Sequence, residues 1–225
     1  KAESIGRDSD VNFLTNPCGE ISLKNGQSCN LSSVICRPED SLETLLDKVR
    51  VATIYGTLQS SLTNFRFLRA KWKKNCDEEA LLGVSLTGIC DHPVLSGKKG
   101  EKILIEWLTA MRKHAREVNK RWAKRLGINP SAAITCIKPE GTSSLLNGSS
   151  SGIHPRYSRY VLRTVRQANT APLTSFLKDQ GVPSEPCNMD PHGTTIFSFP
   201  LESPKESLTT EEVGTIDQLK LGTIY

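Results

Sequence analysis

The residues best suited to chemistry lie near the start of the chain, at the alternate positions Asn16, Cys18 and Glu20. Alternate side chains share a face in an extended segment, so an amide, a thiol and a carboxylate can meet one small substrate. Pro17 fixes its own φ, and Gly19 permits backbone angles closed to other residues. We therefore expect a shaped loop here instead of a regular strand.

A second thiol, Cys29, follows in the same polar stretch. Between the two thiols, Asn25-Gly26 is a strong signal for a tight hairpin turn. A flat two-residue hairpin would set Ser22 opposite Cys29 and leave Cys18 about 13 Å further along the strand. The two thiols could not bond each other in that geometry. A tighter fold of the segment is the open alternative.

A candidate anion site follows a predicted short apolar strand at 132–137. Residues 138–145 read as a glycine-containing loop that opens a helix with small hydroxyl side chains. Free backbone N–H groups and the helix dipole favour a phosphate at such a place, although many similar turns bind nothing. The candidate phosphate-binding residues are Pro139, Glu140, Gly141, Thr142, Ser143 and Ser144.

The composition is that of a globular protein, with 225 residues, 37% of them hydrophobic and 24% charged. No apolar run approaches the roughly 20 residues that span a bilayer, and the first residues lack a signal-peptide core. We expect a cytoplasmic protein without membrane contact. The net charge of +5 is spread along helical segments without interleaved aromatic residues, which argues against nucleic-acid binding.

The seven cysteines form no C-x-x-C pair, so neither a zinc ribbon nor a thioredoxin-type site is predicted, and no metal ligands are assigned. Most of these thiols, Cys90 and Cys136 among them, are expected to be buried packing residues.

The elements that must position these residues alternate between helices and strands, so the fold class is α/β. A helix is predicted to start at an N-cap Asp40 with Glu43 as its capping-box partner, and to reach about Leu68. A buried strand is predicted at 80–88. Further helices are predicted at 101–126, 172–180 and 210–221, and a further strand at 194–199.

Asn16-Pro-Cys-Gly-Glu20, with Cys29 starting Cys-Asn-Leu-Ser eleven residues after Cys18, resembles the active-site finger loop of ribonucleotide reductases. Later landmarks of that family are resembled in the same order by the segments 138–142, 152–155, 160–166 and 197–200. The likeness is closest to the adenosylcobalamin-dependent, monomeric ribonucleoside-triphosphate reductases, and it extends from about Asp10 to near the C-terminus.

The resemblance implies a ten-stranded α/β barrel with the finger loop, here about residues 12–34, threaded through its centre. No cysteine precedes Cys18, and no cysteine pair follows Cys187. Residues 1–225 are accordingly expected to be a partial catalytic barrel domain, a fragment that lacks the N-terminal half of the barrel and the C-terminal reducing tail. Its open sheet edges imply that the missing N-terminal part is a partner.

The resemblance also implies the chemistry, which is reduction of a ribonucleotide to a deoxyribonucleotide for DNA synthesis. Cys18 would carry a thiyl radical, Glu20 would be the general base for the 3′-hydroxyl, and Asn16 would hold a ribose hydroxyl. Cys29 would be half of the dithiol that ends as a disulfide, re-reduced by a thioredoxin-like protein. The cofactor would be adenosylcobalamin, bound largely outside this chain. Glu140 departs from the family pattern, where a small hydroxyl residue is common.

Two alternatives stay open from the sequence. One is a diiron-dependent or glycyl-radical reductase that shares the barrel. The other is a non-catalytic or partner-dependent fragment. The substrate can be a diphosphate or, as the closest likeness favours, a triphosphate.

Overall fold

The computed structural model describes Arg7 and residues 10–225. The chain divides into a larger unit, Lys1–Arg156 with Glu206–Tyr225, and a smaller unit, Tyr157–Lys205. Each unit is described by itself.

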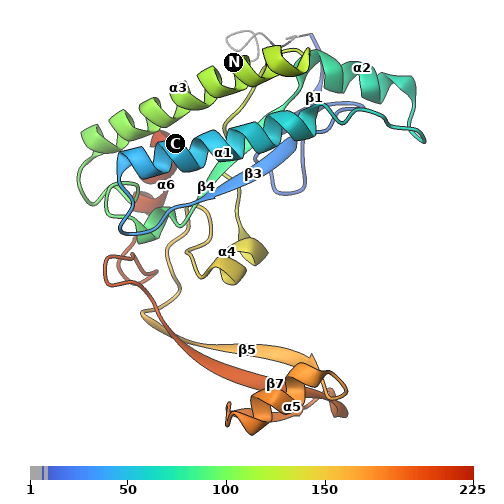
Figure 1. The fold of residues 1–225 in the computed structure, drawn as a ribbon. Coiled ribbons are helices and arrows are strands. Elements are labelled where there is room, and N and C mark those ends of the chain that lie inside the picture. Colours follow the sequence, from blue (N-terminus) through green and yellow to red (C-terminus); the bar gives the residue numbers. More distant parts are fainter. Residues whose placement is uncertain (1–6, 8–9) are drawn as a thin grey trace. The chain divides into compact units, whose positions relative to one another are not determined.

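The larger unit contains the elements that carry the candidate site residues (Figure 1). Its strands are β1 (Phe13–Thr15), β2 (Ser22–Lys24), β3 (Asn30–Ile35) and β4 (Leu82–Thr87). Its helices are α1 (Leu42–Ser60), α2 (Ala70–Glu79), the short 3-10 helix η2 (Ile89–Asp91), α3 (Glu101–Leu126), α4 (Gly141–Asn147) and α6 (Thr215–Ile224).

Strands β3 and β4 are parallel, in a register that runs from Asn30 opposite Leu82 to Ile35 opposite Thr87. The extended segment around Thr135 continues this pairing on the other side of β4, through a parallel bridge to Val84. The strand predicted at 132–137 is therefore present only as this bridge. All six residues of β4 are buried, as the predicted buried strand requires.

The two faces of β4 meet different surroundings, because successive side chains of a strand point to opposite sides. Leu82, Val84 and Leu86 belong to the hydrophobic core that α1 and α3 cover. Gly83 and Ser85 point to the opposite side, which we call the site face. Figure 1 shows α1 and α3 along one side of β3 and β4, with α4 on the other side.

The long helix predicted at 101–126 is confirmed with the same bounds, and Gly127 ends it in the left-handed conformation at φ +68°. The predicted start of α1 is wrong by one residue. Ser41, not Asp40, is the N-cap, and its hydroxyl accepts from the Thr44 N–H at 3.2 Å. The Asp40 carboxylate instead accepts from the Arg37 N–H and from the Lys48 ammonium.

The predicted extension of this helix to Leu68 is also wrong. The helix ends at Ser60, and Leu62 and Phe67 beyond it are 72% and 99% exposed. These apolar side chains beyond Ser60 are not covered by other parts of the described structure, and burial supplies most helical stability. The helix predicted at 210–221 starts later, at Thr215, and α2 was not predicted.

Of the two arrangements left open for Asn25-Gly26, the flat two-residue hairpin does not form. A turn is present there, with Gly26 at φ +76°, but the strands on its two sides do not pair. Instead β2 pairs antiparallel with β1, and Thr15 lies opposite Ser22. The hairpin connection is therefore the stretch 16–21, which carries Cys18 and Glu20.

The smaller unit is a three-stranded antiparallel sheet with one helix. Its strands lie in the order β5 (Tyr160–Ala168), β7 (Asp190–Glu202), β6 (Ser184–Cys187), and its helix is α5 (Pro172–Asp179). Phe197 of β7 is fully buried. The predicted helix at 172–180 and the predicted strand at 194–199 are both present here. Among the helices described for the whole chain, none is long and apolar enough to cross a membrane.

Candidate functional site

The loop between β1 and β2 is closed by Asn16. Its backbone N–H donates to the Ile21 carbonyl at 3.0 Å, and its side-chain Oδ1 accepts from the Ile21 N–H at 3.1 Å. Its own carbonyl accepts from the Gly19 N–H at 3.0 Å, and Gly19 adopts φ +80°. This is the shaped loop expected from the sequence, and Asn16 keeps its side-chain amino group free of that closure.

Glu20 is the chemically unusual member of the loop. Both of its carboxylate oxygens are shielded from solvent, and neither accepts a hydrogen bond from the residues that the structure describes. A buried carboxylate without a donor is costly. The side chain is therefore poised to accept a proton or hydrogen bond from a ligand.

The loop rests on the site face of β4 at Gly83. A Cβ atom at this position would lie 2.4 Å from Leu31 Cδ2, 3.0 Å from Cys136 Sγ and 3.1 Å from Ile21 Cδ1. The approach to Leu31 is closer than real Cβ atoms allow and the other two are unusually tight, so the absent side chain lets the loop, β3 and the Cys136 thiol converge. Glu20, next to Ile21, is thereby held over the sheet.

Two thiols share this face with Glu20. Burial raises the pKa of the half-buried Cys29 thiol, and the Glu20 charge adds to the rise, while its own backbone hydrogen bond and the Lys138 charge oppose it. Burial raises the pKa of Cys136 to about 12, with further contributions from the charges of Glu20, Cys29 and Glu140. Both thiols therefore stay protonated near neutral pH.

Although they share one face of the sheet, the two thiols belong to the two different segments that flank β4. Asn30, next to Cys29, is opposite Leu82, whereas Thr135, next to Cys136, is opposite Val84. Two strand spacings and the offset along the strands separate the two Cα atoms by more than about 10 Å. Disulfide-bonded cysteines have Cα atoms within about 7 Å of each other, so this arrangement does not make them a disulfide pair.

The predicted phosphate loop leads into α4, as expected. Glu140, just before the helix, is 3% exposed. Its carboxylate accepts hydrogen bonds from the hydroxyls of Ser33 on β3 and Ser143 on α4. The carboxylate is therefore held inside the protein by these two hydroxyls and does not point into solvent from the loop. The Gly141 N–H, the first of α4, donates to the Pro139 carbonyl at 3.1 Å.

Gly152, in the 152–155 segment, packs closely against the start of the predicted phosphate loop. A Cβ atom on Gly152 would lie 2.4 Å from the Lys138 carbonyl oxygen, and the Gly152 N–H donates to the Thr87 hydroxyl at 3.0 Å. The Lys138 N–H donates to Ser85 Oγ at 2.8 Å. Residues from the end of β4 thus position both sides of the phosphate loop.

The base of the β1–β2 hairpin is fastened by a buried polar cluster. Arg7 donates to the Ser22 carbonyl at 2.8 Å and to Glu79 at 3.1 Å. Gln27 donates to Glu79 at 2.6 Å and accepts from the Lys24 N–H at 3.1 Å. Because Glu79 ends α2, this helix anchors the hairpin that carries Cys18 and Glu20.

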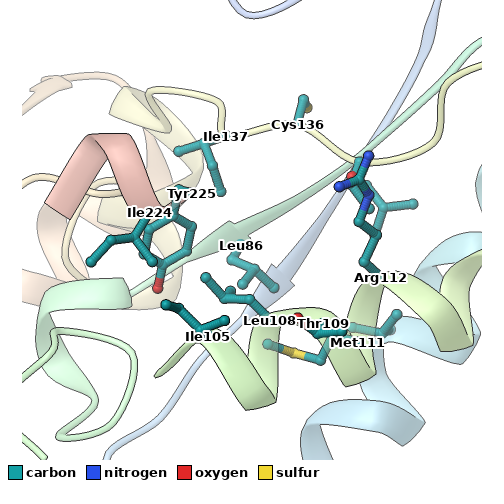
Figure 2. Close-up of a pocket in the computed structure, with 13 residues that line it drawn as sticks. Leu86, Ile105, Leu108, Thr109, Met111, Arg112, Cys136, Ile137, Ile224 and Tyr225 are labelled. Atoms are coloured by element: carbon teal, nitrogen blue, oxygen red, sulfur yellow. The ribbon is translucent and has the colours of Figure 1, made fainter. Parts of the chain in front are cut away.

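A cavity of about 200 Å³ lies on the other side of the sheet, between α3, β4 and the end of α6 (Figure 2). Its side-chain lining is apolar apart from two threonines, Tyr225 and one charged residue, Arg112. Figure 2 shows Ile137 directed into the cavity and Cys136 directed away from it. Without convergent polar groups, this cavity is a weaker candidate than the site face.

The structure places Glu20, Cys29, Cys136 and Lys138 close enough to influence one another electrostatically, and the last two were not among the residues singled out from the sequence. Cys90 is fully buried as expected, whereas Cys136 is half-buried with its sulfur packed beside Gly83. The alternation of Cys136 and Lys138 with the apolar Ile137 was the available signal. Cys18 is exposed at the tip of the loop, apart from the buried Glu20 oxygens.

Curated relatives of this chain share about a third of its residues. A protein of Lactobacillus acidophilus, named adenosylcobalamin-dependent ribonucleoside-triphosphate reductase, is 32% identical over 94% of this chain and 31% of its own length. A protein of the same name from Euglena gracilis is 30% identical over 92% of this chain and 27% of its own length. The chain thus spans about a third of the length of the curated relatives it matches. No family model matches it.

A solved structure shares the fold. The crystal structure of a B-12 dependent (class II) ribonucleotide reductase superposes on 96% of this chain with a TM-score of 0.79, at 24% identity, and 33% of that protein is covered. The resemblance drawn from the Cys18 loop and the later landmarks is confirmed by these relatives. They do not favour a diiron or glycyl-radical type.

Proposed function

We propose that this chain, a relative of the adenosylcobalamin-dependent ribonucleoside-triphosphate reductases, is the part of such an enzyme that holds the ribose during reduction. The observation that carries the proposal is the buried, unpartnered Glu20 carboxylate beside Cys29, on the sheet face beneath the loop that carries Cys18. In the whole enzyme this face would be the inside of a ten-stranded barrel, with residues 12–34 as the finger loop.

Each side chain has a role that its surroundings allow. Glu20 accepts the 3′-hydroxyl proton, because its oxygens have no other donor. Asn16 binds a ribose hydroxyl through its side-chain amino group, since its Oδ1 is used to close the loop. Cys18, accessible at the loop tip, is oxidised to a thiyl radical and removes the 3′ hydrogen atom.

The reducing equivalents come from a dithiol. Cys29 supplies one thiol, and the 2′-hydroxyl leaves as water when two thiols become a disulfide, so two electrons and two protons are accounted for. The geometry of β4 argues against Cys136 as the partner thiol, which we place elsewhere in the enzyme. A thioredoxin-like protein would then reduce the disulfide. The substrate phosphates would bind the amides of residues 139–144.

Adenosylcobalamin would supply the radical that oxidises Cys18. The exposure of the Cys18 thiol fits a radical source outside this chain. We therefore place the corrin contacts in other parts of the enzyme.

A chimaera tests this function. This chain would replace the matching third of the Lactobacillus acidophilus reductase, and deoxyribonucleotide formation would be measured with and without adenosylcobalamin. We expect cobalamin-dependent turnover, its loss in Cys18→Ser, and a loss of more than about 100-fold in Glu20→Gln with substrate binding retained. Cys187→Ser, in the smaller unit, is the matched thiol control and should stay active.

The opposite results are equally clear. Turnover by the Cys18→Ser chimaera would refute the radical role. A folded chimaera that binds nucleotide and cobalamin without turnover would favour the non-catalytic alternative.

A further inference from the structure

Two opposite charges face the same surface without pairing. The Glu20 oxygens accept no hydrogen bond from the residues in the described part of the chain. The Lys138 ammonium, for its part, takes no part in the ion pairs found among those residues. Its backbone N–H is fixed on Ser85 Oγ, on the site face of β4.

The direction of the Lys138 side chain follows from the alternation of the extended segment. Ile137 points into the cavity beside α3 and Cys136 points away from it (Figure 2). In an extended segment Lys138 shares the side of Cys136. The charge of Lys138 also lowers the pKa of both Cys29 and Cys136, against the larger effect of burial, which places the ammonium near both thiols.

The candidate phosphate loop, residues 139–144, carries a negative charge that would repel a phosphate. The Glu140 carboxylate lies within this loop and accepts hydrogen bonds from the Ser33 and Ser143 hydroxyls. A negative charge beside a phosphate is unfavourable unless a cation offsets it. Lys138, two residues earlier, is a cation on the same face that has no other partner in the described structure.

We propose that Lys138 is a substrate-binding residue whose ammonium pairs with the phosphates of the ribonucleotide while Glu20 accepts from its ribose hydroxyl. The inference rests on the proposed function and extends it, because the family resemblance pointed only to the backbone of residues 139–144. A ribonucleotide carries hydroxyl donors at one end and a polyanion at the other, which is the complement of a free carboxylate and a free ammonium on one face.

The test uses the full chain and two measurements, one with added ligand and one without. Calorimetric titration with ATP, CTP and inorganic tripolyphosphate would compare Lys138→Gln and Lys138→Arg with wild type. Lys120→Gln, an exposed lysine of α3 on the other side of the sheet, is the matched control. Lys138→Gln should weaken nucleotide binding about 10-fold or more, Lys138→Arg by less than about 3-fold, and Lys120→Gln by less than about 2-fold.

The second readout needs no ligand. Residue-resolved mass spectrometry would follow alkylation of Cys29 against pH, and Lys138→Gln should slow it because a nearby positive charge favours the thiolate. Equal nucleotide affinity of Lys138→Gln and wild type would overturn the inference and leave the proposed function standing. Failure of the wild-type chain to bind any nucleotide, with Cys29 alkylation still dependent on Lys138, would instead count against the proposed function and the binding role together.

Discussion

Glu79→Gln should loosen the hairpin that carries Cys18 and Glu20, although Glu79 lies far from both in the sequence. The Glu79 carboxylate is 5% exposed and lies 2.9 Å from the Arg7 guanidinium and 3.3 Å from the Lys24 ammonium. Both cations are buried, at 7% and 9% exposure. Glutamine keeps the size of the side chain but leaves the buried Arg7 without its carboxylate and Lys24 with Glu78 as its remaining partner.

The size of the effect follows from this burial. Removing one partner of a buried ion pair typically costs about 3–5 kcal/mol, because an uncompensated charge remains. The Glu78 carboxylate can partly compensate, since it lies 3.1 Å from Lys24. We therefore expect a loss of about 3 kcal/mol for Glu79→Gln. Glu78→Gln is the matched control, because its side chain is 59% exposed and such pairs contribute about 1 kcal/mol or less.

The effect should also depend on pH. Burial raises the pKa of Glu79, but hydrogen bonds from Arg7 and Gln27 and the charges of Arg7 and Lys24 outweigh it, so the net pKa is lowered. A carboxyl with a lowered folded-state pKa stabilises above its unfolded value, about 4.3, and loses that contribution as the pH falls through the folded-state pKa. The gap between wild type and Glu79→Gln should therefore shrink on acidification below about pH 4.

Urea denaturation would measure the free energy of unfolding from pH 3 to pH 7, and amide hydrogen exchange would report the opening of β1 and β2. Faster exchange confined to these strands would show that the cluster fastens the hairpin. A loss below about 0.5 kcal/mol at pH 7, or a loss equal to that of Glu78→Gln, would refute the reasoning.

Three further predictions test the site and its supports. Gly83→Ala places a Cβ 2.4 Å from Leu31 Cδ2; it should cost about 1–3 kcal/mol in denaturation and speed exchange in the loop, and an unchanged loop would contradict the close contact. Asp91→Asn breaks the buried pair with Arg156, whose Nε lies 2.8 Å from Oδ1; thermal unfolding should show a loss of about 3 kcal/mol, whereas an unchanged melting temperature would contradict the pairing. Because burial raises the pKa of Cys29, its alkylation rate should keep rising above pH 9, and a plateau below pH 8 would disprove the environment assigned to it.

Where periodicity was strong, the sequence predicted structure well. The helix at 101–126 carries an apolar stripe at helical spacing and a stop at Gly127, and its bounds are confirmed. The buried strand around Val84 was predicted for a similar reason, since a short apolar run between glycines has few other uses. The helix at 70–79 was missed because Trp72 and Cys76 are its sole large apolar residues and no stripe forms.

The hairpin forms between β1 and β2 and not around Asn25-Gly26, because side-chain hydrogen bonds outweigh the local turn signal. Asn25-Gly26 has the turn chemistry, yet the side chain of Gln27 takes the Lys24 N–H that a hairpin ladder would need. The loop between β1 and β2 is closed by the Asn16 side chain, which accepts a hydrogen bond from the Ile21 N–H. Sequence patterns for turns do not reveal such a side-chain contact across five residues. The thiol environment of Cys136 depended on Gly83, about fifty positions away in the chain, which a one-dimensional pattern does not reveal.

Strand β4 divides its six residues between two tasks. Leu82, Val84 and Leu86 serve the core, while Gly83 and Ser85 support the loop and Lys138. Saturation mutagenesis along this strand should therefore separate into two interleaved classes of variant. Changes at positions 82, 84 and 86 would act through the hydrophobic core, whereas changes at positions 83 and 85 would act through the loop and the Lys138 backbone. Within this strand, residues that support the site therefore alternate one by one with residues that hold the core together.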